Sequence, residues 1–76
     1  MDYILITLKL GKDKIYELKI PSEVTAGELV DMIQEAFGME SKERKTLHIE
    51  PLGRILSEDE VLIEEGVYNG SQITLL

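Results

Sequence analysis

Hydrophobic residues recur with helical spacing in one long stretch of the chain, residues 25–38. Thr25 has the side-chain oxygen of a helix N-cap, and Glu28 follows at the spacing of a capping box. Beyond them, apolar residues recur at intervals of three and four: Leu29, Met32, Ile33 and Ala36. Three polar residues take the other side in this register: Asp31, Gln34 and Glu35. Gly38, which accepts a positive φ, ends the pattern, so we predict a helix whose apolar stripe is covered by the rest of the chain.

Alternating apolar and polar residues predict strands before and after this helix. Tyr3–Leu10 and Ile15–Ile20 alternate with a period of two and are joined by a short turn that contains glycine, which is the pattern of a β-hairpin. Glu17 and Lys19 put charge on the second of these strands, as suits a sheet edge, and Pro21 ends it. Three shorter strands are expected in the second half of the chain: Thr46–Glu50, Ile55–Leu56 and Gln72–Leu76.

The order of these elements predicts a single α+β domain over residues 1–76. A hairpin, one helix and three short strands match the β-grasp arrangement, a mixed sheet with one helix packed across one face. We expect the first and last strands to be parallel neighbours at the centre of the sheet. The charged stretch 39–46 predicts a loop, and 57–65 predicts a short helical turn. The expected core is apolar throughout: Ile4, Ile6, Leu18, Leu29, Ile33, Leu56, Leu62, Ile73 and Leu75.

Composition narrows the classes of partner. Eight basic and fifteen acidic residues give a formal net charge of −7, which argues against nucleic acid and against anionic lipid, because both bind basic faces. No apolar run approaches the roughly 18 residues of a membrane span, and the N-terminus lacks the basic region and cleavage site of a signal peptide. The chain has no cysteine, so disulfides and thiolate chemistry are excluded. Together these features predict a cytoplasmic protein without direct membrane insertion.

The titratable residues do not form a pattern typical of catalysis or of metal binding. His48 is the single histidine, and an outward-facing strand residue is the simplest interpretation of it. The acidic run that includes Glu58, Asp59 and Glu60 lacks the alternating ligands and central glycine of a calcium loop, so it is interpreted as the solvated start of a helical turn. We therefore predict a protein that is not an enzyme and has no catalytic residue, cofactor or metal. Turnover of a substrate by the purified domain would favour the opposite view.

Four segments resemble ubiquitin, and together they cover nearly the whole chain. They correspond to the exit from the second strand, the helix, the corner before the fourth strand and the approach to the last strand: Ile20–Thr25, Thr25–Gly38, Ile49–Leu56 and Gly66–Leu75. Ubiquitin-like modifiers and sulfur carriers end in a flexible Gly-Gly tail, whereas this sequence stops at Leu75-Leu76. The resemblance therefore implies a protein that is not conjugated to targets. The alternative is a modifier or sulfur-carrier relative whose Gly-Gly tail is absent from this chain.

Among ubiquitin-like families without such a tail, the chain most resembles the YukD/EsaB group of the bacterial type VII secretion systems, which export WXG-type substrates. The similar features are its length, a first strand rich in isoleucine and leucine, the turn Asn69-Gly70-Ser71 and the end at Leu75-Leu76. The resemblance implies a cytosolic accessory or regulatory protein that binds other proteins, among them components of the secretion system. It assigns no functional residue.

One surface of the predicted sheet is a candidate for binding a partner. Because side chains alternate along a strand, Tyr3 and Leu5 lie on the face opposite to Ile4 and Ile6, and therefore away from the helix. Four apolar residues are expected on this outer face: Tyr3, Leu5, Ile15 and Leu76. If they form one patch, the chain associates through it with another protein or as a homodimer. The alternative interpretation is that single apolar residues on a surface are ordinary.

Overall fold

The computed structural model describes residues 2–39 and 45–76. The predicted order of elements is confirmed, with five strands, one α-helix and one short 3₁₀ helix. Their bounds are β1 Tyr3–Lys9, β2 Ile15–Pro21, α1 Ala26–Ala36, β3 Leu47–Glu50, β4 Arg54–Leu56, the 3₁₀ helix Ile63–Glu65 and β5 Gln72–Leu75. Most of the loop predicted over 39–46 lies outside the described residues.

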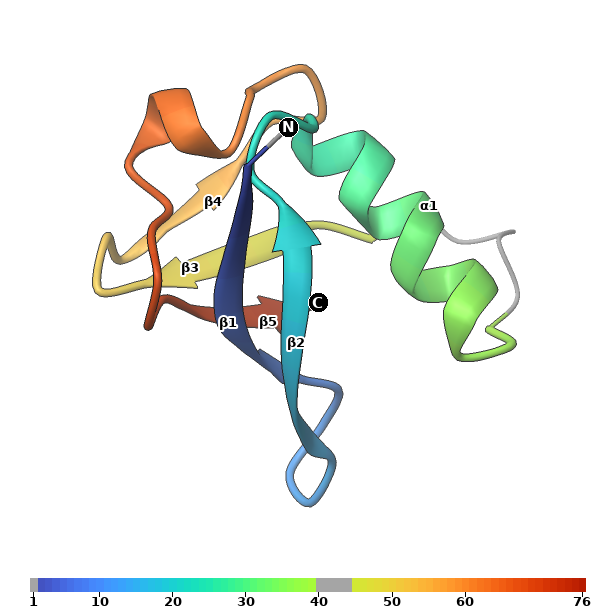
Figure 1. The fold of residues 1–76 in the computed structure, drawn as a ribbon. Helices are drawn as coiled ribbons and strands as arrows, with labels where there is room; N and C mark the ends of the chain where they lie inside the picture. Colours follow the sequence, from blue (N-terminus) through green and yellow to red (C-terminus); the bar gives the residue numbers. More distant parts are fainter. Residues whose placement is uncertain (1, 40–44) are drawn as a thin grey trace.

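The five strands form one mixed sheet in the order β2-β1-β5-β3-β4 (Figure 1). Strand β1 pairs antiparallel with β2 and parallel with β5, so the predicted parallel neighbours are confirmed. Strand β3 pairs antiparallel with β5 on one side and with β4 on the other. The two outermost strands are therefore β2 and β4, and β2 has the edge position that Glu17 and Lys19 predict.

Helix α1 begins where its capping box predicts. The Glu28 N–H donates to the Thr25 hydroxyl over 3.1 Å, and the Thr25 N–H donates to the Glu28 carboxylate over 3.0 Å. These bonds satisfy backbone groups that have no partner inside the helix. At the other end the helix closes at Phe37, and Gly38 follows with a φ of 66°, a conformation that costs glycine little.

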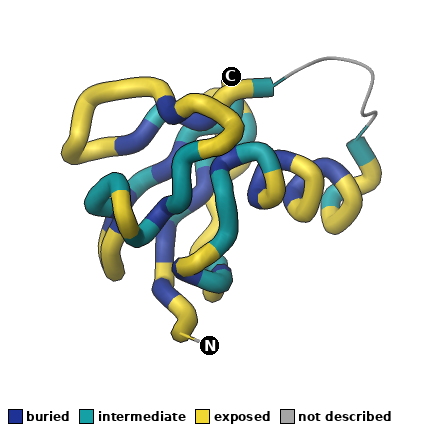
Figure 2. The backbone as a smooth tube through the Cα atoms, turned by 90° about the horizontal axis from the view of Figure 1, so that it is seen from above, coloured by how far each residue is buried: buried dark blue, intermediate teal, exposed yellow. Residues whose placement is uncertain are grey.

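The core lies between the helix and the sheet and follows the alternation of the strands. Dark segments in Figure 2 mark buried residues on the inner strands and on one side of the helix. Seven of the nine predicted core residues are buried, namely Ile4, Ile6, Leu29, Ile33, Leu56, Leu62 and Ile73. Leu18 and Leu75 are only partly buried and pack against this cluster.

The helix covers the sheet with a different stripe from the one its spacing predicts. Met32, assigned to the buried stripe, is 42% exposed, and Ala36 is exposed as well. Ala26 and Val30 are buried beside Leu29 and Ile33 instead. Gln34, which the sequence places on the polar side, is also buried. The reason is geometric. One possible stripe contains Met32 and Ala36, the other contains Ala26 and Val30, and both include Leu29 and Ile33. The way the helix packs across the sheet selects the second stripe.

Candidate protein-interaction surfaces

All four predicted surface residues are exposed, and the pleat of the sheet turns Tyr3, Leu5 and Ile15 away from the helix. Tyr3, Leu5, Ile15 and Leu76 are each between 52% and 59% exposed. Tyr3 and Leu5 alternate along β1 with the buried Ile4 and Ile6, so they face away from α1. Leu76 follows β5 and exchanges two backbone hydrogen bonds with Thr46, of 2.9 and 3.3 Å.

The strand register brings only two of the four residues together. Tyr3 and Leu5 occupy one end of β1, where Leu5 pairs with Lys19. Ile15 pairs with Lys9 at the opposite end of the same strand, and Leu76 lies beyond the Lys9–Thr74 pairing. A polar row crosses the sheet between these two groups: Glu17, Thr7, Gln72 and Glu50. The outer face therefore carries an apolar pair, Tyr3 and Leu5, and two apolar residues at separate positions.

Neighbouring segments fix the backbone around Tyr3 and Leu5. The Leu5 N–H donates to the Asn69 Oδ1 over 2.8 Å, and the Gly70 N–H donates to the Leu5 carbonyl over 2.9 Å. The Lys19 Nζ lies 5.2 Å from the centre of the Tyr3 ring, within the range of a cation–π contact. These contacts hold the backbone of the apolar pair in one conformation, which lowers the entropic cost of any contact made through it.

Sequence reasoning missed one apolar residue on this same face. Ile55 pairs with His48, which pairs with Thr74, and so Ile55 shares the outer face at the β4 edge. It is 51% exposed. The strand that contains it is only three residues long, so no alternation along that strand could assign its face, and the pairing with β3 was needed. His48 itself lies 3.8 Å from the Glu50 carboxylate on this open face.

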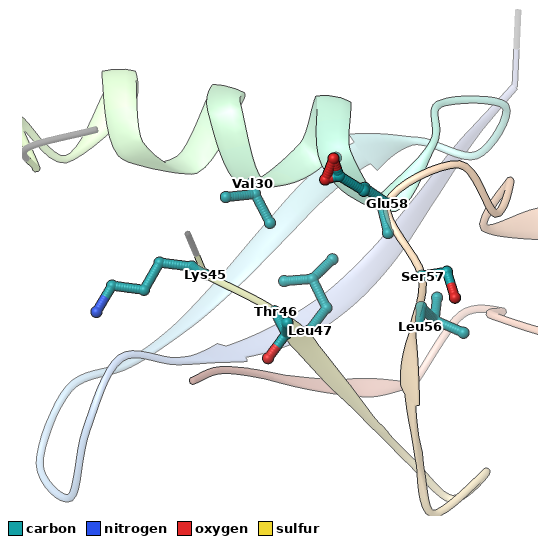
Figure 3. A pocket seen from close by; sticks show the side chains of 9 residues that line it. Val30, Lys45, Thr46, Leu47, Leu56, Ser57 and Glu58 are labelled. Atoms are coloured by element: carbon teal, nitrogen blue, oxygen red, sulfur yellow. The ribbon is translucent and has the colours of Figure 1, made fainter. Parts of the chain in front are cut away.

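A cavity of about 290 Å³ opens between the first turn of α1 and strands β3 and β4. In Figure 3, Val30 points from the helix toward Leu47, Lys45 lies at one end of the cavity, and Ser57 and Glu58 lie at the other. The close approach of Glu58 favours glycine at position 27, because a Cβ there would lie 3.0 Å from the Glu58 Cβ and the two segments would have to move apart slightly. The polar part of the lining consists of a threonine, a serine, a lysine and a glutamate.

A second groove lies on the other side of α1, between the helix and the edge strand β2. Its volume is about 250 Å³, and its lining is almost entirely apolar: Leu18, Lys19, Ile20, Leu29, Met32, Ile33, Ala36 and Phe37. The rings of Tyr16 and Phe37 meet nearby, with their centres 4.8 Å apart. The sequence signal for this groove was present in the wide apolar stripe of the helix, but we assigned Met32 and Ala36 to the core.

Charged side chains gather where β4 meets the loop that follows it. Arg54 forms ion pairs with Glu60, at 3.4 Å, and with Glu65. The backbone N–H of Ser57 donates to the Glu60 carboxylate and lowers the pKa of that group, and Arg54 contributes in the same direction. Among residues 2–39 and 45–76, no three histidine, cysteine or acidic residues are grouped so that they could hold a metal ion.

A family model described as the WXG100 protein secretion system protein YukD matches residues 3–75. The chain belongs to the YukD family. The match spans every strand and the helix of the fold, so the resemblance seen in the sequence is confirmed. A search of curated proteins finds no match. Within the described part of this YukD-family chain, no helix is long and apolar enough to cross a membrane.

Solved structures similar to this YukD-family chain are ubiquitin-like. A structure from work on molecular mimicry of SUMO in DNA repair superposes with a TM-score of 0.84 at 20% identity, covering 100% of this chain and 92% of the other. The ubiquitin-like domain of the Arabidopsis thaliana protein At2g32350 gives 0.79 at 23% identity, covering 100% and 78%. AtBAG1, solved in complex with HSP70, gives 0.77 at 22% identity, covering 96% and 39%. At these identities the likeness establishes the ubiquitin-like β-grasp fold.

Proposed function

We propose that this chain is a non-catalytic accessory protein of a WXG100, type VII secretion system, which acts in the cytoplasm by binding other proteins. The observation that carries the proposal is the YukD family match over residues 3–75. The ubiquitin-like fold supports a binding role, because one structural neighbour, AtBAG1, was solved with a protein partner. In this proposal the protein works without being conjugated to targets.

The binding surface in this proposal is the outer face of the sheet, centred on Tyr3 and Leu5. Both side chains are more than half exposed, and the contacts with Lys19 and Asn69 hold them in place. Ile15 and Leu76 extend the surface beyond the polar row as secondary contacts. Exposed apolar side chains on a fixed backbone favour association, since each buried Å² contributes about 25 cal/mol before the cost of association is subtracted.

Secretion of a WXG-type substrate tests the proposal in the organism that carries the gene. Deleting the gene should reduce export of that substrate, and the wild-type gene should restore it. A Leu5→Lys variant should restore export poorly, although the fold is intact, because the side chain points away from the core. An Ile55→Lys variant makes the same chemical change at the far edge of the same face and should restore export well.

Two results would contradict this proposal. Normal export in the deletion strain would show that the protein is not needed for secretion. If the Leu5→Lys variant restored export fully, at protein levels equal to wild type, the outer face would not be the binding surface. Sedimentation of the purified protein adds a further check: if self-association is present and Leu5→Lys abolishes it, the face joins two copies of the chain rather than the chain and another protein.

A further inference from the structure

Within residues 2–39 and 45–76, no strand pairs with the edge of β2 that faces away from β1. In an antiparallel pair, residues alternate between those that bond to the partner strand and those whose N–H and C=O point outward. Two backbone bonds fix this alternation at the ends of the hairpin: Leu10 N–H to the Lys14 carbonyl, 2.8 Å, and Ser22 N–H to the Asp2 carbonyl, 3.0 Å. Even-numbered residues of β2 therefore bond to β1, and the odd-numbered Ile15, Glu17 and Lys19 point theirs toward the free edge.

The groove beside this edge provides an apolar site for side chains. Met32 and Ala36 lie on the helix next to the buried Leu29 and Ile33 but are themselves exposed. The apolar surface of α1 therefore extends beyond the part of the helix that the sheet covers. A strand added to β2 would lie about 4.8 Å beyond it, and every second side chain would enter the groove of about 250 Å³ above Leu18.

Charge around the groove selects the kind of strand that fits. Helix α1 carries Glu28, Asp31 and Glu35 and no basic residue. Its last turn also lacks a basic side chain, so the negative end of the helix dipole near Phe37 is not compensated from within the helix. A segment with lysine or arginine at its end would meet this negative potential. A second copy of the chain, with a net charge of −7, would be repelled.

We propose that β2 accepts an extended, basic segment of a partner protein as a sixth strand of the sheet, with alternate apolar side chains in the groove beside α1. Backbone hydrogen bonds to Ile15, Glu17 and Lys19 supply affinity, and the groove selects the side chains. The inference deepens the proposed role in protein binding but uses a surface on the opposite side of the sheet from Tyr3 and Leu5. Lys19 lines the groove, but its ammonium group lies over the Tyr3 ring on the outer face, and Glu17 does not line the groove.

A designed peptide probes the edge directly. The probe is a blocked peptide of alternating valine and threonine with a lysine at each end, added at millimolar concentration to the purified 76-residue protein. Hydrogen exchange followed by NMR should show slower exchange of the Ile15, Glu17 and Lys19 amides, by about tenfold or more, together with a shift of the Met32 methyl signal. A matched peptide with glutamate in place of lysine should bind more weakly.

Variants separate the backbone contact from the side-chain contact. Glu17→Pro removes one outward N–H and leaves the bonds to β1 in place, so it should abolish protection by the peptide, whereas Glu17→Ala should preserve it. Met32→Gln removes the apolar contact at an exposed position without changing the charge and should weaken binding of the peptide at least tenfold. This variant tests the groove independently of whether Glu17→Pro folds. Leu5→Lys should bind the peptide normally.

Three results would overturn the inference. The first is unchanged exchange at Ile15, Glu17 and Lys19 with saturating peptide. The second is a set of shifts confined to the outer face around Leu5. The third is sedimentation as a dimer that Glu17→Pro dissociates, since the occupant would then be a second copy. A failed secretion experiment leaves these measurements unaffected, so the edge site and the secretion role are judged separately.

Discussion

The two long sides of helix α1 are held in different ways. On the side of the loop that follows β4, backbone bonds attach the first turn: Ala26 N–H donates to the Glu60 carbonyl and Gly27 N–H to the Glu58 carbonyl, both over 2.9 Å. On the side of β2, the groove is lined by apolar side chains such as Leu29 and Ile33. Directional bonds fix the position of the helix, whereas side-chain contacts leave room for an added strand. The bonded side therefore fixes where the helix starts, whereas on the other side the proposed recognition groove lies directly over core residues such as Leu29 and Ile33.

The sharpest test of this comparison uses two neighbouring residues of the helix. Ile33→Ala should lower the free energy of unfolding by about 2–5 kcal/mol, because Ile33 is 3% exposed and its loss leaves a cavity. Met32→Ala, one position earlier, should cost less than about 1 kcal/mol, since that side chain is largely outside the core. Denaturant unfolding measures both values. Equal losses would mean that the helix covers the sheet with both stripes.

The attached side of the helix is tested at Gly27. A methyl group there would lie 3.0 Å from the Glu58 Cβ and 3.1 Å from the Glu58 carbonyl oxygen, which is too close without a shift of the loop. Overpacking of this kind costs about 1–3 kcal/mol, and the better helix propensity of alanine offsets about 1 kcal/mol. Gly27→Ala should therefore destabilise the protein by about 1 kcal/mol in thermal or denaturant unfolding.

The matched control is Asp31→Ala, on the exposed surface of the same helix, where only the propensity changes. It should leave stability unchanged or raise it slightly. A stabilising effect of Gly27→Ala equal to that of Asp31→Ala would show that the loop yields easily and that the backbone bonds do not fix the helix.

The smallest expected effect is a dependence of stability on pH at the start of the helix. The N–H and then the hydroxyl of Thr25 bond the Glu28 carboxylate and lower its pKa below the ordinary value of 4.5. A carboxylate with a lowered pKa stabilises the folded state fully above the unfolded pKa, and this contribution is lost as the pH falls through the folded pKa. The stability difference between wild type and Glu28→Gln should therefore shrink below pH 4.5. A difference that stays constant from pH 7 to pH 3 would exclude the capping box as its source.

Local patterns explain most of what the sequence predicted correctly. The capping box needs only Thr25 and Glu28 three residues apart. The outward direction of Tyr3 and Leu5 follows from alternation in a single strand. The remaining questions concern relations between elements: Met32 was wrongly assigned to the buried stripe of the helix, and alternation could not decide whether the four exposed apolar residues form one patch. Both depend on the helix crossing and on the strand register, which no local pattern specifies.

The sequence by itself determined the elements and their order, because these follow from periodicity, capping and turn residues that act over a few positions. The central parallel pair and the family were expected from the order of the elements and from the resemblance to known families. Only the tertiary structure decided which stripe of α1 is covered and that the edge of β2 adjoins an apolar groove. The physical reason is that a helical repeat of 3.6 residues leaves adjacent stripes that both include Leu29 and Ile33. The packing of the whole sheet against the helix chooses between them and leaves Met32 exposed.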